Sequence, residues 1–264
     1  MADSDFTHAD GDGGSHAPIP KVFHRIWLGG PMPEEFRRYG TTWTDRHPDW
    51  TMVEWTEDNL PPLRNQECFD AAISLAEQSD ILRFEILWLH GGVYLDTDFE
   101  CLRPIDELLE GVSAFSAHEF DDADRVATGV MGAVAQHPFI GAVIDALPAS
   151  IAEHGSSNPP SSTGPAFMTR CVAAWAASGH EELTVFPASM FYPYSWRELH
   201  RRFEDFPDAY AVHHWAGSWR EPAGSRLQRW ARRILMRTAP TRRILYLHAR
   251  ITKGGAPPQA MIDP

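Results

Sequence analysis

Long hydrophobic runs are missing from this sequence, and cysteine is scarce. No apolar stretch approaches the ~18 residues that a membrane-spanning helix needs. The three cysteines (Cys68, Cys101 and Cys171) are scattered, odd in number and not spaced like metal ligands, so we expect no disulfide framework. Residues 1–16 have neither the basic start nor the apolar core of a signal peptide. These absences favour a protein of a reducing, cytoplasmic compartment.

Acidic residues outnumber basic ones, and the two kinds are unevenly distributed along the chain. Over 264 residues, 36 Asp and Glu oppose 23 Lys and Arg, which gives a net charge of -13. Residues 220–264 nevertheless contain ten Arg or Lys and only two acidic residues. The strongly acidic remainder argues against nucleic-acid binding across its surface. With 43% hydrophobic residues, the composition is typical of a globular protein and excludes wholesale disorder.

The chain divides into three parts by composition. Residues 1–19, rich in Gly and polar side chains, are expected to form a flexible leader, and residues 221–264 a basic helical extension. Between them, in residues 20–220, strand-like and helix-like segments alternate, which predicts an α/β fold with a mainly parallel central sheet. A loop is expected at 155–165. Strands are expected at 21–28, 50–55, 93–97, 112–117, 127–133 and 209–215, and helices at 33–46, 67–76, 79–90, 137–154 and 164–177.

The strongest chemical signal is the pair of aspartates Asp96 and Asp98, which follows the apolar segment 91–95. On an extended segment, carboxylates two residues apart share one face. They would lie at the C-terminal edge of the sheet, where open α/β sheets bind ligands. Two like charges held there repel each other, and a divalent cation such as Mg²⁺ or Mn²⁺ removes that cost. A solvated strand end is the commoner origin of an isolated Asp-x-Asp pair, but the buried strand before this pair favours a metal site.

A second signal lies upstream, where Asp80 and Arg83 share one face of the helix expected at 79–90. An intrahelical ion pair worth a few tenths of a kcal/mol explains this spacing by itself. The functional alternative is a carboxylate and a guanidinium that bind sugar hydroxyls near the strand end. We also expect Ser79 to be the N-cap of this helix, with Asp80 at the positive end of its dipole.

Two further segments carry candidate binding residues. The strand expected at 209–215 ends in His213 and His214, and because neighbours on a strand point to opposite faces, at most one of them can bind a metal. Ser218 and Trp219 follow and could donate hydrogen bonds to a phosphate. A core strand with satisfied histidines is the ordinary alternative. Near the start of the chain, Trp27 precedes two glycines and either stacks on a flat base or packs in the core.

Together these segments resemble the DXD-containing sugar transferases of glycosyltransferase family 32, which include yeast-type initiating mannosyltransferases and bacterial capsular transferases. The resemblance spans about residues 18–220, and the block from Ser79 to Asp98 is also similar to the catalytic domain of the large clostridial glucosylating toxins. It is carried by IPKVFHRIWLGG at 19–30, SDILRFEILWLHGGVYLDTDF at 79–99, Thr163-Gly164-Pro165, and HHWAGSW at 213–219.

The resemblance implies a GT-A (Rossmann-like) nucleotide-sugar-binding fold followed by C-terminal helices. It also implies a bound Mn²⁺ or Mg²⁺ ion, a UDP- or GDP-hexose donor, a hydroxyl acceptor and retention at the anomeric carbon. It assigns catalysis to Asp80, Arg83 and Asp96, and the metal to Asp96, Asp98 and His214. It assigns the donor to Ile26, Trp27, Asp80, Arg83, Tyr94, Asp96, Ser218 and Trp219. Thr128 stands where family members often carry Asn, so the resemblance does not place the acceptor.

Two other functions stay open on the same residues. One is a toxin-like effector that glycosylates a protein, and the other is a nucleotide-sugar hydrolase or binding module. The intact pair Asp96 and Asp98 favours an active transferase. The basic segment 221–264 also has two explanations: a helix packed on the acidic body, or an interfacial helix on anionic lipid. The second would place the enzyme at the inner face of a membrane.

Overall fold

The computed structural model describes residues 17–120, 123–180 and 182–217. These residues form two units: one from residue 17 to Pro193 together with Phe206–His214, and a smaller one from Tyr194–Asp205 with residues 215–217. The smaller unit contains a short 3₁₀ helix at Leu199–Phe203. In this described part of the chain, no helix is long and apolar enough to cross a membrane. The expected leader and basic extension lie almost entirely outside the described residues, so the three-part division stays a prediction.

The large unit is built on a mixed β-sheet with helices beside it, which confirms the α/β prediction. β1 runs parallel to both β2 and β3, whereas β7 runs antiparallel to β3 and to β5. The sheet is therefore mixed rather than mainly parallel, because alternation of strands and helices in a sequence does not specify strand direction. The described strands, in sheet order, are β2 (Thr51–Trp55), β1 (Val22–Ile26), β3 (Gly92–Leu95), β7 (Val130–Ala133), β5 (Ala114–Phe120) and β6 (Ala123–Val126), with β8 (Thr184–Phe186) parallel to β5.

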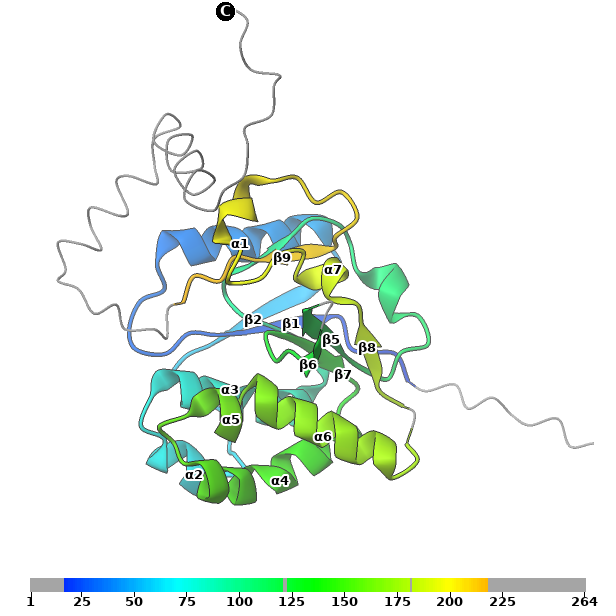
Figure 1. Cartoon of the computed structure of the whole chain (residues 1–264). Helices are drawn as coiled ribbons and strands as arrows, with labels where there is room; N and C mark the ends of the chain where they lie inside the picture. Colours follow the sequence, from blue (N-terminus) through cyan, green and yellow to red (C-terminus); the bar gives the residue numbers. More distant parts are fainter. Residues whose placement is uncertain (1–16, 121–122, 181, 218–264) are drawn as a thin grey trace, which may run out of the picture. The chain divides into compact units, whose positions relative to one another are not determined.

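Helices cover the sheet on both faces (Figure 1). On one side lie α2 (Gln66–Ala71), α3 (Leu75–His90), α4 (Pro138–His154), α5 (Pro159–Ser162) and α6 (Pro165–Ala177). On the other side lie α1 (Glu34–Arg46), α7 (Ala188–Phe191) and a two-stranded sheet of β4 (Phe99–Cys101) and β9 (Ala211–His213). A short 3₁₀ helix spans Asp106–Leu109.

The main core lies between the sheet and helices α3, α4 and α6. Its fully buried members include Phe84 of α3, Ile144 of α4 and Phe167 of α6. The loop expected at 155–165 contains the one-turn helix α5, which begins at a proline whose fixed φ suits a first helical position.

Helix α3 begins four residues earlier than expected. Its N-cap is Ser74, whose hydroxyl accepts a hydrogen bond from the Glu77 backbone N–H at 3.2 Å. The Glu77 carboxylate in turn accepts the backbone N–H of Ile73 at 3.1 Å. Ser79 is therefore not the cap, and Asp80 lies more than a turn inside the helix, away from the dipole's positive end.

Two glycines connect α3 to β3, and neither position accepts a side chain. Gly91 ends the helix with φ +64°, and Gly92 begins the strand with φ +90°. A Cβ at Gly92 would lie 2.5 Å from the Val22 carbonyl oxygen. This close approach lets β3 pair with β1 on one side and β7 on the other. The residues that follow β3 therefore emerge in the middle of the sheet edge.

Beside this junction, His24 of β1 is buried and uncharged. The Trp55 indole N–H donates to His24 Nδ1 at 3.2 Å, so Nε2 carries the proton and donates to the Gly91 carbonyl oxygen at 2.9 Å. Burial lowers the pKa of His24 to about 4. Because the unfolded chain binds this proton more readily, folding stability should fall as the pH drops from about 6.5 to about 4.

We expect His24→Gln to remove this pH dependence. At neutral pH the wild type should be the more stable protein. Its advantage should then shrink by up to about 3 kcal/mol between pH 7 and pH 4. Urea unfolding of both proteins across this range measures the difference and cancels the titration of other groups. An advantage that stays constant with pH would contradict a neutral buried His24.

Candidate metal and donor site

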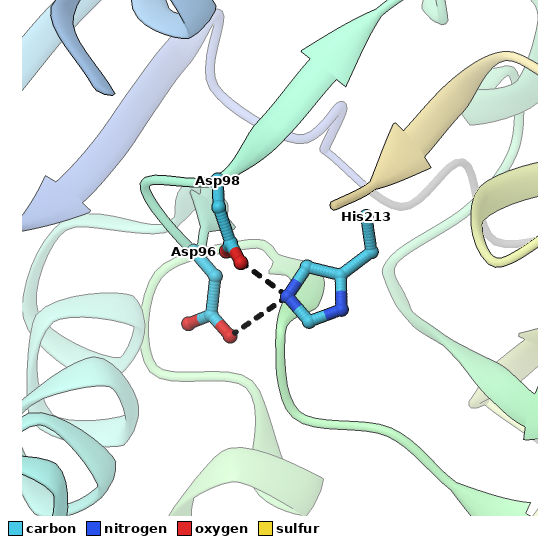
Figure 2. Close-up of side chains that lie close together, drawn as sticks. All are labelled: Asp96, Asp98 and His213. Atoms are coloured by element: carbon cyan, nitrogen blue, oxygen red, sulfur yellow. Dashed lines mark ion pairs between the residues drawn. The ribbon is translucent and has the colours of Figure 1, made fainter. Parts of the chain in front are cut away.

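The two aspartates of the motif lie in a tight turn between β3 and β4. The strand ends at Leu95, and the Phe99 backbone N–H donates to the Asp96 carbonyl oxygen at 3.1 Å. The Asp96 N–H is held by the Gly129 carbonyl oxygen at 2.7 Å. The expectation of an extended segment is thus wrong, since the chain turns between Asp96 and Phe99 before it enters β4. The carboxylates of Asp96 and Asp98 still lie close together (Figure 2).

His213, at the end of β9, completes a cluster with these aspartates. Its Nε2 lies 3.0 Å from Asp98 Oδ1 and 3.7 Å from Asp96 Oδ2 (Figure 2). One possible ligand atom from each residue lies within 4.8 Å of the others. The antiparallel pairing of β4 with β9 sets Phe99 opposite His213, and the Phe99 ring stacks on the imidazole at 4.7 Å. Tyr192 contacts the same imidazole edge-on at 5.4 Å.

His214, the histidine expected to bind the metal, lies elsewhere. Its Nε2 is 2.8 Å from Glu100 Oε2, and its ring stacks on Tyr39 of α1 at 4.6 Å. This hydrogen bond lowers the pKa of Glu100. The structure thus places His213, not His214, beside the aspartates. Neighbouring strand residues face opposite ways, and only the pairing of β9 with β4 decides which of them faces the turn.

Arg83 of α3 reaches the same turn, and Asp80 is joined to the turn through Arg83. Arg83 Nη2 lies 2.8 Å from Asp80 Oδ1, and its Nη1 lies 3.5 Å from Asp96 Oδ1. Nη1 also donates to the Thr128 carbonyl oxygen at 2.7 Å, and the Thr163 hydroxyl donates to Asp80 Oδ2 at 2.8 Å. Asp80 and Arg83 are only 8% and 5% exposed. A solvated intrahelical ion pair does not describe this arrangement, because the pair is part of the network around the turn.

Burial and neighbouring charges determine the protonation of this network. Burial raises the pKa of Asp80 to about 6, although Arg83 and the Thr163 hydroxyl oppose the rise. Burial alone would lower the pKa of Arg83, but Tyr94 and the acids beside it raise it overall, so Arg83 stays charged. Burial likewise lowers the pKa of His213, but Asp98 and the other acids beside it raise this pKa above its usual range.

Tyr94 supports the site from within the sheet. Its hydroxyl donates to Asp96 Oδ1 at 2.7 Å, and the Arg83 guanidinium lies over its ring at 4.7 Å. Tyr94 is 2% exposed, so it contacts and orients the Asp96 and Arg83 side chains from the protein interior.

The remaining donor candidates differ in accessibility. Ile26 is buried in the core, whereas Trp27 at the end of β1 is half-buried and packs against Phe36 at 4.9 Å. Of these two side chains, Trp27 is therefore the one that a ligand can reach. Ser218 and Trp219 lie outside the described residues.

Sequence reasoning gave no role to two residues of the site. Thr163 belongs to the Thr163-Gly164-Pro165 motif, but its hydrogen bond to Asp80 joins residues 83 positions apart. No short sequence pattern predicts such a contact. Gly129 leaves room for the turn, since a Cβ there would lie 2.8 Å from Asp96 Oδ2.

The cluster has the chemistry of a divalent-cation site. Carboxylate oxygens suit Mg²⁺ and Mn²⁺, and an imidazole nitrogen suits transition metals. Three protein ligands leave coordination positions for a phosphate-bearing partner. Two carboxylates from one turn and an imidazole from β9, which together form a largely buried cluster, therefore fit a divalent cation.

Comparisons with known proteins confirm the family resemblance. Residues 33–114 match the family model described as "Glycosyltransferase sugar-binding region containing DXD motif". The chain is 28% identical over 222 residues to inositol phosphoceramide mannosyltransferase 3 of Schizosaccharomyces pombe, covering 76% of this chain and 61% of that enzyme. It is 30% identical over 152 residues to the human alpha-1,4-N-acetylglucosaminyltransferase, covering 52% of this chain and 42% of that one. The chain thus spans less than two thirds of the length of either relative.

Structural comparison confirms the GT-A fold. The ligand-free glycosyltransferase domain of the YGT toxin aligns with a TM-score of 0.50 and 12% identity, over 64% of this chain and 80% of that one. At this level of identity the likeness shows the fold alone.

The two histidines can be separated by mutation. We expect His213→Ala to weaken Mn²⁺ binding by about tenfold or more, because a direct ligand is lost. His214→Ala, the matched control, should change it less than about threefold. Titration of Mn²⁺ followed by electron paramagnetic resonance measures both. A stronger effect of the His214 substitution would favour the assignment expected from the motif.

Proposed function

Because residues 33–114 carry the sugar-binding region of the DXD glycosyltransferases, we propose that the chain is a metal-dependent retaining glycosyltransferase. It moves a hexose from a nucleoside diphosphate sugar to an acceptor hydroxyl. The observation that carries the proposal is the convergence of Asp96, Asp98 and His213 in one cluster. That cluster is joined through Arg83 to the buried Asp80. The fold alone carries no activity, so the site is what supports this function.

The proposed metal ligands are Asp98 and His213, and Asp96 of the same cluster would complete the set. Asp98 Oδ1 and His213 Nε2 approach each other most closely, whereas Asp96 Oδ1 is already engaged by Tyr94 and Arg83. An imidazole nitrogen in the set favours Mn²⁺ over Mg²⁺, which prefers oxygen ligands. When bound, such an ion offsets the charge that develops on the leaving diphosphate.

Asp80 and Arg83 are proposed to hold the donor sugar. Both side chains are preorganised, Asp80 by Thr163 and Arg83 by the Thr128 carbonyl. A carboxylate and a forked guanidinium can accept from and donate to neighbouring hydroxyls of one sugar. Retention follows the resemblance: the acceptor attacks on the face from which the diphosphate leaves, and the leaving phosphate oxygen takes the acceptor proton. Ser218 and Trp219 stay proposed diphosphate contacts.

The acceptor is proposed to be a hydroxyl of a polysaccharide, a lipid-linked intermediate or a small molecule. The S. pombe relative is named for inositol phosphoceramide, which supports a lipid-linked hydroxyl among these. A cytoplasmic location, and contact of residues 221–264 with an anionic membrane, stay predictions from the sequence.

We expect the chain to release nucleoside diphosphate from one member of a panel of UDP- and GDP-hexoses when Mn²⁺ is present, and to stop when a chelator is added. Asp98→Ala should lower turnover at least about 100-fold, since it removes a direct ligand to the ion that stabilises the leaving group. Circular dichroism should show that this variant keeps its fold. Wild-type turnover by Asp98→Ala would refute the metal assignment, and equal rates with and without added acceptors would favour the hydrolase.

Trp27 is proposed to stack on the donor base. We expect Trp27→Ala to raise the donor KM about tenfold while kcat changes little, since base stacking is worth about 1–3 kcal/mol. Trp27→Phe keeps a ring and should retain most of the affinity. Steady-state kinetics with the active donor measures KM and kcat separately. An unchanged KM in Trp27→Ala would assign this side chain to packing against Phe36 alone.

A further inference from the structure

Arg25 of β1 is a buried charge that the proposed chemistry does not use. Its side chain is only 2% exposed, and it lies in the strand next to β3, from which the metal-binding turn emerges. A guanidinium taken out of water is costly unless its donors are satisfied. An apolar side chain would fill such a position with less penalty. The contacts of Arg25 therefore indicate what the charge is for.

Those contacts tie the turn to the neighbouring layer. Nη2 donates to the carbonyl oxygen of Thr97, the central residue of the Asp-Thr-Asp motif, at 3.0 Å. The same nitrogen donates to the Phe36 carbonyl oxygen of α1 at 2.5 Å. Nη1 donates to Glu54 Oε1 of β2 at 3.1 Å. One guanidinium thus connects the turn, a helix and a neighbouring strand.

Helix α1 makes room for this guanidinium at one position. A Cβ on Gly40 would lie 2.1 Å from Arg25 Nη1 and 3.0 Å from its Cζ. Gly40 has an ordinary helical backbone, so its lack of a side chain serves space rather than a special φ. The packing of α1 and the position of Arg25 are therefore coupled. A side chain added at position 40 would displace the Arg25 guanidinium.

We infer that Arg25 is a positioning residue that fixes the Asp96–Asp98 turn for cation binding by holding the Thr97 carbonyl. The inference rests on the proposed metal site. With the Thr97 carbonyl held from below, the Asp96 and Asp98 side chains leave the turn in set directions. Outer-shell groups that orient ligands typically change metal affinity by ~10–100-fold when removed.

The hydrogen bonds of Arg25 and its positive charge predict opposite effects on metal affinity. A cation beneath the turn would by itself repel a metal ion, so removing it would tighten binding. The Glu54 carboxylate beside Arg25 offsets that charge, which leaves the forked hydrogen bonding as the larger effect. Lysine keeps the charge but has one nitrogen in place of the fork. It cannot hold Thr97, Phe36 and Glu54 in the same geometry.

The test is Mn²⁺ titration of the full chain, followed by electron paramagnetic resonance, for the wild type, Arg25→Lys, Arg25→Gln and Gly40→Ala. We expect each substitution to weaken Mn²⁺ binding about tenfold. Gly40→Ala acts by displacing the guanidinium and keeps the test open if an Arg25 variant fails to fold. Arg46→Lys is the matched control, since Arg46 of α1 donates to the Leu102 carbonyl oxygen at 3.0 Å, outside the turn. It should bind Mn²⁺ like the wild type.

Three results would overturn the inference. The first is wild-type Mn²⁺ affinity in Arg25→Lys, Arg25→Gln and Gly40→Ala alike. The second is tighter binding by Arg25→Gln with no change in Arg25→Lys, which would assign the effect to charge. The third is equal weakening in Arg46→Lys, which would mean that any perturbation of this layer has the same effect. A wild-type chain that binds no Mn²⁺ would instead refute the proposed function itself, and the inference with it.

Discussion

The proposed site is organised around two carboxylates, those of Asp96 and Asp98, which one turn holds close together although they repel each other. Asp96 and Asp98 lie together after a buried strand, where water cannot fully screen them. Arg83 offsets part of this charge from α3, and His213 approaches from β9. The remaining excess of negative charge is what a divalent cation would neutralise. The backbone thus brings two like charges together, and charged groups from several elements offset them.

The fold supplies those groups from segments far apart in the sequence. Asp80 and Thr163 are separated by 83 positions, and Phe99 pairs with His213 across the β4–β9 ladder. Only the turn itself is local. This explains why the strongest motif in the sequence is the aspartate pair, and why its partners are weak signals when each is viewed alone.

Much of the secondary structure was predictable from local rules. The strand at 22–26 and the helix at 34–46 lie within two residues of their expected bounds, because β-formers, a proline start and acidic first-turn residues are local signals. Two kinds of error have physical causes. Ser74 and Ser79 both precede helical sequence, so local rules do not decide between them as the N-cap. The structure shows that the cap is Ser74. The direction of β7 was not predictable, because strand pairing depends on contacts between distant residues.

By itself, the sequence determined the aspartate pair, its place after a buried strand, the family it resembles, and the spacing that puts Asp80 and Arg83 on one helical face. These are properties of short segments: the resemblance rests on their motifs, and the shared helical face on the helical period. The tertiary structure alone decided that His213 rather than His214 faces the aspartates, and that Thr163 holds Asp80. It also decided that Arg25 reaches beneath the turn. Each of these depends on which face of one element meets another, and that is set by long-range pairing and packing rather than by neighbours along the chain.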